Sequence, residues 1–307
     1  MLFRNKKKTF IISLLSFTIV CGCVAHYKTT SDSFTAVKNT ESIERGKNLV
    51  FNICAGCHLN HEVHTFIGNH LGEIPKFLGT VYSANLTHSE TFGVIPHYTD
   101  AELIYFFKTG ISKNGRYIPY MLKPMLADKD INDIIIYLRS NDVPLAAADT
   151  SVGKTHMNMF GRIAIRLTGK PRPYIKRVAL PDENNPAEYG HYLVGAIGCY
   201  HCHSKSSLKL DYVNPERSKG YMAGGKRFKD PQGNRVYSYN LTPDKETGIG
   251  YFTKEDFRKA VREGLTPDDK KLRPPMGQFH SLTDKQVDAI YSYLQTLTPK
   301  HNLIKGH

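Results

Sequence analysis

Tryptophan is absent from this sequence of 307 residues, and cysteine is scarce, with six in all. Two of the six, Cys21 and Cys23, lie near the amino terminus, and the other four form two closely spaced pairs. No cysteine is therefore left over for a structural disulfide, which argues against a disulfide-stabilised scaffold. The apolar run from Thr9 to Val20 is also short of the roughly 20 residues that span a bilayer.

The first 22 residues are predicted to be a lipoprotein signal peptide and not part of the fold. A basic segment, Arg4 and Lys6 to Lys8, precedes the apolar run, as in export signals. The run ends in Val20-Cys21-Gly22-Cys23, which resembles a bacterial lipobox and makes Cys23 the expected lipid anchor. Cleavage after Ala25 is the alternative, and it would discard Cys23. Residues 23–40, rich in Ser and Thr, are then expected to form a tether.

Composition places the remainder among soluble globular proteins, since 40% of the residues are hydrophobic and 22% are charged. The formal net charge is +13, and removal of a leader with four basic and no acidic residues lowers it to +9. Such a charge suits an acidic protein partner or an anionic membrane surface. Because export separates the chain from nucleic acid, no nucleic-acid partner is expected. We place the protein on the periplasmic side of a bacterial membrane, held there by its lipid.

The remaining four cysteines lie in one five-residue pattern, which occurs as "CAGCH" at residues 54–58 and as "CYHCH" at residues 199–203. Two cysteines at this spacing on a helical turn can each add to one vinyl group of a haem, while the following histidine lies under the iron and ligates it. The sequence therefore predicts two covalently bound haem c groups. The expected thioether residues are Cys54, Cys57, Cys199 and Cys202, and the expected axial histidines are His58 and His203.

Two other uses of paired cysteines fit this pattern less well. Zinc ribbons place their two cysteine pairs about 15 to 20 residues apart, whereas residues 58–198 separate the pairs here. A thioredoxin-like redox motif follows a β-strand and does not require the histidine that ends both patterns. Haem attachment is thus the interpretation that accounts for the histidines as well as the cysteines.

An internal duplication surrounds the two motifs. Residues 45–50 correspond to residues 189–194, and "VYSANLT" at 81–87 corresponds to "VYSYNLT" at 236–242. In each half a capping box, at Thr99 or Thr253, opens a short helix that ends at a glycine, Gly110 or Gly264. Each half closes with an amphipathic helix, over 131–138 and 287–294, the second opened by a capping box at Thr283. We therefore expect an all-α fold of two similar helical domains, each around one haem.

The duplication also selects the sixth ligands of the two irons. Met121 and Met276 occupy corresponding positions, after a proline-containing loop and ahead of the terminal helix of each half. Met125 lies closer to its helix and would have to ligate from the helix mouth. An isolated methionine usually fills a core, but the matched positions favour Met121 and Met276 as axial ligands. Histidines at positions 61, 64 and 70 crowd the first motif, so bis-histidine ligation of the first haem stays open.

The stretch "NLTPDKETGIGYFTKEDFRKAVREG" at residues 240–264 resembles the signature of the cytochrome subunits that accompany bacterial membrane-bound alcohol and gluconate dehydrogenases. The resemblance covers residues 40–143 and 185–298 in outline. It implies two tandem cytochrome c-like domains, with His58 and Met121 axial to the first haem, and with His203 and Met276 axial to the second. Those subunits usually carry three haems, whereas this chain has two motifs, so its partner need not be the same.

The expected domain boundaries follow from changes in pattern. The first domain is expected at 41–143 and the second at 185–300, with a basic linker at 144–184 and a tail at 301–307. Asn185 is the expected N-cap of the second domain, with Glu188 completing a capping box. From Ser151 to Pro181 the linker has seven basic residues and no acidic one. It is either a solvated crossover whose arginines lie near haem propionates, or a docking segment for an anionic membrane or an acidic partner.

Histidine and methionine together saturate the iron, which suits electron relay and not chemistry on a substrate. No catalytic residue is therefore expected. We expect a carrier that takes electrons from a membrane-associated dehydrogenase or a quinol-oxidising complex and passes them to a terminal oxidase or a soluble carrier. The alternative is a dihaem enzyme, either a peroxidase or a thiosulfate-oxidising enzyme, in which one half should lack the matched methionine.

Overall fold

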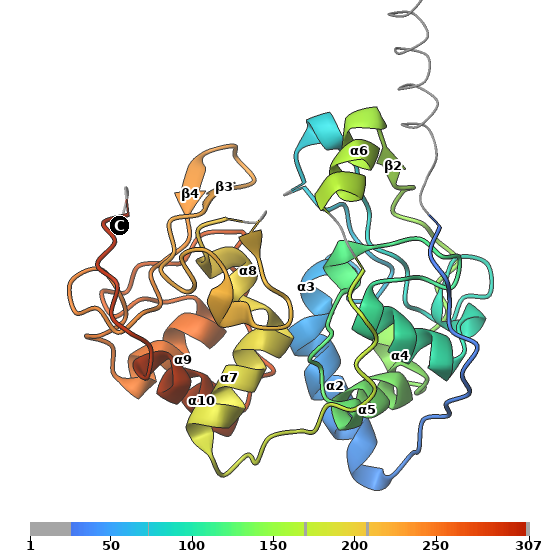
Figure 1. The fold of residues 1–307 in the computed structure, drawn as a ribbon, viewed down its shortest axis with the longest axis horizontal. Coiled ribbons are helices and arrows are strands. Elements are labelled where there is room, and N and C mark those ends of the chain that lie inside the picture. Colours follow the sequence, from blue (N-terminus) through green and yellow to red (C-terminus); the bar gives the residue numbers. More distant parts are fainter. Residues whose placement is uncertain (1–25, 73, 169–170, 207–208, 305–307) are drawn as a thin grey trace, which may run out of the picture.

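The computed structural model describes residues 26–72, 74–168, 171–206 and 209–304 (Figure 1). Over these residues the chain is mainly helical, with nine α-helices and four strands of two or three residues each. The prediction of a helical fold is confirmed in this coarse sense, while the two small sheets are an addition to it. None of the helices in these ranges is long and apolar enough to cross a bilayer. The predicted signal peptide and Cys23 lie outside the described residues.

The first half of the chain, residues 26–168, is built around two helices that pack along each other, α2 and α5. Its helices are α2 (Thr40–Ile53), α3 (Ala55–His58), α4 (Asp100–Thr109), α5 (Asp128–Leu138) and α6 (Met159–Thr168). Short 3-10 turns lie at Lys76–Leu78, Ile95–His97, Pro119–Met121 and Val143–Leu145. Strand β1 (Gly79–Thr80) pairs antiparallel with β2 (His156–Met157), which lies far along the chain.

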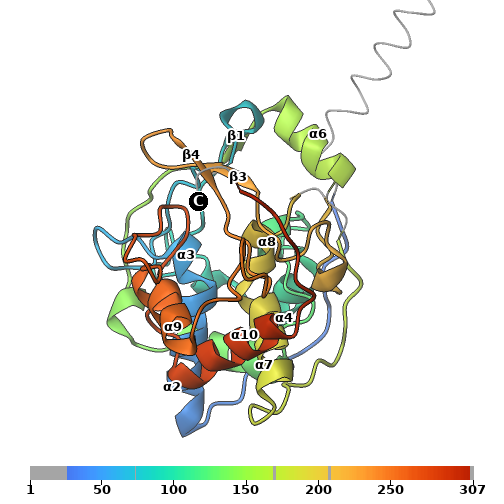
Figure 2. The same cartoon turned by 90° about the vertical axis from the view of Figure 1, so that its left-hand side faces the viewer.

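The second half, residues 186–304, repeats the order of the first four helices. It contains α7 (Pro186–Ile197), α8 (Cys199–His203), α9 (Lys254–Glu263) and α10 (Asp284–Gln295), a 3-10 turn at Pro215–Arg217, and an antiparallel pair of β3 (Arg227–Lys229) and β4 (Arg235–Tyr237). Along the chain, α7 to α10 correspond to α2 to α5. Figure 1 shows the two sets of helices side by side, with α7 and α2 at the boundary between them, and in Figure 2 the second set lies in front of the first.

Capping residues and glycines set the helix ends as predicted. Thr99, Thr253 and Thr283 each accept a hydrogen bond from the backbone N–H of the third helical residue, whose side chain accepts one from the cap in return. Helices α4 and α9 end at Gly110 and Gly264, which are both left-handed, with φ of 73° and 69°.

The capping box predicted at Asn185 is wrong. Asn185 does occupy the N-cap of α7, with Pro186 at the first helical position. Its side-chain amide donates to the carboxylate of Glu188 at 3.0 Å, so the side chain caps no backbone N–H. Pro186 has no backbone N–H, so the amino-terminal end of α7 has one fewer N–H group that needs a hydrogen-bond acceptor.

A glycine marks the crossing of the two main helices in each half. A Cβ atom on Gly46 of α2 would lie 2.0 Å from the carbonyl oxygen of Asp133 on α5. A Cβ atom on Gly190 of α7 would lie 1.9 Å from the carbonyl oxygen of Ala289 on α10. Only a residue without a side chain lets two backbones approach this closely. The two crossings therefore share one geometry, at positions that the internal duplication pairs.

Each half has a hydrophobic cluster, and the two clusters share residues at the boundary. The first is built mainly from α2, α4 and α5, and it includes Leu145, which is fully buried beyond the expected boundary at residue 143. It also includes Ala196 of α7. The second is built mainly from α7, α9 and α10, and Tyr192 packs against both clusters. The division into two tandem domains stays a prediction.

Segments that the sequence places outside the domains pack on the first half. Residues 26–39 run along it in extended form, with the N–H of Ala36 donating to Asp100 at 2.9 Å and that of Val37 donating to Asn132 at 2.8 Å. Within the expected linker, β2 pairs with β1, and α6 packs on the turn at 76–78. These segments are therefore partly built into the fold.

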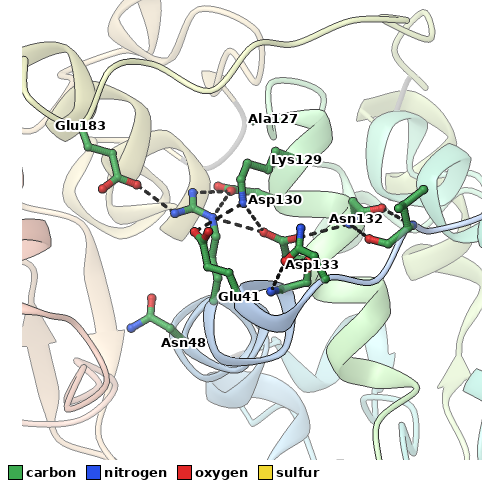
Figure 3. Close-up of polar contacts among 12 residues, drawn as sticks. Glu41, Asn48, Ala127, Lys129, Asp130, Asn132, Asp133 and Glu183 are labelled. Atoms are coloured by element: carbon green, nitrogen blue, oxygen red, sulfur yellow. Dashed lines mark hydrogen bonds and ion pairs between the residues drawn. The ribbon is translucent and has the colours of Figure 1, made fainter.

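Arg45 of α2 joins elements of both halves through carboxylates, of which Figure 3 labels Asp130, Asp133 and Glu183. Its guanidinium contacts Asp130 at 2.6 Å and Asp133 at 3.4 Å, both on α5, and Glu183 of the connecting segment at 2.9 Å. Glu183 also contacts Lys285 of α10, at 3.3 Å. Burial alone would lower the pKa of Arg45, but the carboxylates, Asp130 foremost, raise it above its ordinary value. The network therefore stays charged and links α2, α5 and α10.

Candidate haem sites

Each cysteine motif lies on a short helix directly after the helix that carries the crossing glycine. Cys54 ends α2 and opens α3, while Gly198, left-handed with φ of 93°, separates α7 from α8. Cys54, Cys57 and Cys199 are partly buried, Cys202 is exposed, and all four are outside disulfides. Burial raises the pKa of the Cys54 and Cys199 thiols to about 12, which keeps both thiols protonated before any attachment.

The two motif histidines are held in the same way. His58 and His203 are both buried, with 8% and 7% of their surface exposed. Nδ1 of His58 lies 2.8 Å from the carbonyl oxygen of Ala84, and Nδ1 of His203 lies 2.7 Å from that of Tyr239. Because a carbonyl can only accept, Nδ1 carries the proton in each ring. Burial lowers the pKa of His58, although the contact with Ala84 acts against the shift. A neutral imidazole fixed through one nitrogen is the usual form of a metal-ligating histidine.

Matched hydrogen bonds hold the loops behind the two histidines. The carbonyl of His58 accepts from the N–H of Gly68 at 3.0 Å, and that of His203 accepts from Gly224 at 2.8 Å. In both copies of "NLT", the asparagine side chain accepts from the N–H of the threonine, at 2.7 Å in the first half and 3.0 Å in the second. The two halves therefore present their histidines in the same backbone frame.

Met121 and Met276 lie in equivalent loops. Each loop starts at the glycine that ends α4 or α9, whose carbonyl accepts from Ile118 at 2.8 Å or from Leu272 at 2.7 Å. The N–H of each methionine then donates to the carbonyl of the third residue before it, at 3.1 Å for Met121 and 3.3 Å for Met276. Both methionines are partly buried, and Met121 packs on the first cluster together with Cys54. Their role as axial ligands stays a prediction.

The rival ligands of the first haem lie on the surface. Met125 is 40% exposed. His61, His64 and His70 are exposed as well, and His70 packs against the ring of Tyr82 with 5.2 Å between the centroids. Their exposure favours Met121 over all four of them.

An unsatisfied donor between the halves fits a cofactor that bears carboxylates. Nε of Arg172, in the segment that joins the halves, is buried and has no hydrogen-bond partner among the described residues. Tyr117 of the first half and Tyr212 of the second lie near it. Burial raises the pKa of Tyr117 to about 12 and also raises that of Tyr212, and Arg172 acts against both shifts. A buried guanidinium donor suits a haem propionate. Together with two thiol pairs and two fixed imidazoles, it forms a donor set that fits haem c.

Lys123 lies beside the second motif, although no pattern in the sequence predicts this position. Lys123 lies in the loop of Met121, and its Nζ donates to the carbonyl oxygen of Ala196, near the end of α7, at 2.8 Å. The same Nζ lies 3.3 Å from the position that a Cβ of Gly198 would take, directly before Cys199. A lone lysine in a loop is usually a surface residue. Its place against the second motif depends on tertiary packing that no spacing in the sequence predicts.

No protein-family model matches the chain. Among curated proteins, the fructose dehydrogenase cytochrome subunit of Gluconobacter japonicus is 37% identical over 127 residues, which are 38% of this chain and 24% of that protein. The gluconate 2-dehydrogenase cytochrome c subunit of Pantoea cypripedii is 35% identical over 36% of this chain and 24% of that protein. A diheme cytochrome c-type protein of Cereibacter sphaeroides is 26% identical over 39% of each chain.

The matched segment spans 24% of the length of each of those two dehydrogenase subunits. Among solved structures, the reducing HAO-like protein complex of Kuenenia stuttgartiensis has a TM-score of 0.24 at 16% identity, over 86% of this chain and 98% of that chain, a likeness too weak to support an argument. By sequence, then, the chain is a homologue, at moderate identity, of the cytochrome c subunits of bacterial fructose, gluconate and alcohol dehydrogenases and of a diheme cytochrome c.

Proposed function

We propose that the protein is a dihaem c-type cytochrome that relays electrons, with one covalently bound haem c in each of two tandem domains. The thioether residues are Cys54 and Cys57 for the first haem and Cys199 and Cys202 for the second, and the axial pairs are His58 with Met121 and His203 with Met276. The observation that supports this most is the repeated frame. In both halves a buried histidine is bonded through Nδ1 to a carbonyl, and an equivalent methionine loop follows.

The residues of each site have separate tasks. The hydrogen bonds from Nδ1 of His58 to Ala84 and from Nδ1 of His203 to Tyr239 orient the rings and make Nε2 more basic. The methionines supply a soft thioether sulfur. His58 with Met121 and His203 with Met276 would hold the two irons, and this would leave no open position for a substrate at either metal. The bound haem supplies the one-electron Fe(III)/Fe(II) couple.

A membrane-associated dehydrogenase or a quinol-oxidising complex is the proposed electron donor, and a terminal oxidase or a soluble carrier is the proposed acceptor. The names of the relatives support a dehydrogenase. The formal charge of +9 that remains without the leader suits docking on an acidic partner. The basic and apolar leader, directly followed by Cys23, supports export to the periplasmic side and a lipid anchor there.

The full chain, produced in bacteria that attach haem c, tests the proposal. We expect two haems per chain to be retained after denaturation, and low-spin absorption spectra in both oxidation states. Met121→Ala and Met276→Ala should each convert one haem to a high-spin form, while the control Met125→Ala should convert none. Fewer than two retained haems would contradict the proposal. A resting protein that binds carbon monoxide or reacts with peroxide would favour the dihaem enzyme instead.

A further inference from the structure

Lys123 is a cation that lies against both motifs. Its backbone N–H donates to the carbonyl of Phe107 on α4 at 2.6 Å, which fixes the loop of Met121. Its Nζ donates to the carbonyl of Ala196 at 2.8 Å, near the end of α7. Lys123 also follows Met121 by two residues, and Met121 packs on the first cluster together with Cys54 of the first motif. Its charge opposes the rise in pKa of the Cys54 thiol and of the Cys199 thiol. A single ammonium group is therefore within electrostatic reach of both attachment sites.

A neutral carbonyl, and not a carboxylate, receives the Nζ of Lys123. Burial lowers the pKa of Lys123, and Cys54, Cys199 and Cys57 of the two motifs act against this shift. A partly buried cation without a counter-charge is unfavourable. An electron held nearby would offset that cost.

The equivalent position of the second half is apolar. There the N–H of Phe279 donates to the carbonyl of Val261 on α9 at 3.0 Å, as Lys123 donates to Phe107 on α4. Phe107 and Val261 occupy the same place in their helices. Of these two equivalent positions, the one with the cation donates a side-chain hydrogen bond to the other half, at Ala196.

We propose that Lys123 raises the reduction potentials of both haem sites and holds the first methionine loop against the second motif. Fe(II) carries one positive charge less than Fe(III), so a fixed cation beside the site favours the reduced form. Because the residue lies against both motifs, it raises both potentials. This inference rests on the proposed function, since it requires a haem at each motif.

Three variants of the full-length haem protein separate the charge of Lys123 from its position. Lys123→Arg keeps the charge, Lys123→Gln keeps a donor for Ala196 without the charge, and Lys123→Met removes both. Lys254→Met, which removes an exposed lysine at the start of α9, is the control. Both midpoint potentials are measured by spectroelectrochemical titration. Haem content and methionine ligation are read from the absorption spectra of the same samples.

We expect Lys123→Gln and Lys123→Met to lower both midpoint potentials, and Lys123→Arg and Lys254→Met to leave both near the wild-type values. The proposal is overturned if Lys123→Gln keeps both wild-type potentials or lowers only one of them. Lys123→Gln tests the effect of the charge on the potentials even if Lys123→Met displaces Met121 from the first haem. A missing second haem in the wild-type protein contradicts the proposed function instead, and the haem count shows it before any potential is measured.

Discussion

The hydroxyl of Tyr192 on α7 donates to a carboxylate oxygen of Asp130 on α5 at 2.5 Å, across the boundary between the halves. The same hydroxyl accepts from the backbone N–H of Ala127 at 3.1 Å. Asp130 is fully buried and also contacts Arg45. Burial, and after it the charge of Asp130, raises the pKa of Tyr192 well above its ordinary value, so the hydroxyl keeps its proton. A side chain of the second half thus completes the buried polar network of the first.

Removal of this hydroxyl in Tyr192→Phe should lower the free energy of unfolding by about 1.5 to 3 kcal/mol, because a hydrogen bond to a charged group is lost. Tyr251→Phe is the control, since its hydroxyl lies in an exposed pair with Tyr239, and it should cost less than about 1 kcal/mol. Urea unfolding followed by circular dichroism measures both. Equal losses in the two variants would count against a special role for the contact between Tyr192 and Asp130.

Two glycines of α7 lead to opposite expectations. Gly190→Ala places a Cβ 1.9 Å from the carbonyl oxygen of Ala289, so α7 and α10 must move apart, and we expect a loss of about 1 to 3 kcal/mol or more. Gly195→Ala meets nothing within 4 Å and should stabilise the protein by up to about 1 kcal/mol, because alanine favours a helix. Thermal unfolding of the two variants compares them. A melting temperature unchanged by Gly190→Ala would disprove the close crossing.

Arg45→Met should destabilise the protein by about 3 to 5 kcal/mol, because it leaves buried carboxylates without their cation. The side chains of Asp130 and Asp133 are each 1% exposed. Lys285→Met, which removes the half-exposed cation at the far end of the same network, should cost at most about 1 kcal/mol. Chemical denaturation of both variants tests the contrast. If Lys285→Met lowers the free energy of unfolding more than Arg45→Met does, Arg45 is not the central cation of the network.

Acid should weaken the fold through Asp142 and Glu183. Burial alone would raise the pKa of Asp142, but the Tyr137 hydroxyl and the Lys47 ammonium outweigh it, and the pKa is lowered. The pKa of Glu183 is lowered in the same sense by its two cations. A depressed pKa in the folded state adds stability above the unfolded value of about 4. That stability is lost as the pH falls through the lower folded value.

The free energy of unfolding should therefore decline below about pH 4, and Asp142→Asn should make the decline shallower. Unfolding measured at a series of pH values between 3 and 7 gives both slopes. If the free energy of unfolding of Asp142→Asn falls as steeply below pH 4 as that of the wild type, other groups cause the pH dependence.

Local chemistry made the helix ends and the cysteine motifs predictable. Thr99, Thr253 and Thr283 cap their helices through side chains only three residues away, and Gly110 and Gly264 end helices by their own left-handed backbone. These features need no information from the rest of the chain. Comparison of the two halves then paired the methionine loops, whose hydrogen bonds correspond.

The contacts between distant segments could not be predicted in this way. The hydrogen bonds from Lys123 to Ala196 and from Tyr192 to Asp130 join residues of different halves, so they form only when both halves have folded. The same holds for Leu145, whose burial in the first cluster lies beyond the predicted domain boundary. Helix α6 was missed because its surroundings are rich in Pro and Gly, which weakens the periodic pattern on which such a prediction depends.

Ala196 belongs to α7, yet it is 6% exposed and lies in the hydrophobic cluster of the first half. A fragment that stops before α7 would open that cluster to water, and a fragment that begins there would bear an apolar face without its cover. The helices that carry the two cysteine motifs are consequently joined by shared packing at the boundary between the halves. In the proposed function, an electron that passes between the two haems would cross a distance that this packing sets at folding, without an encounter between separate bodies.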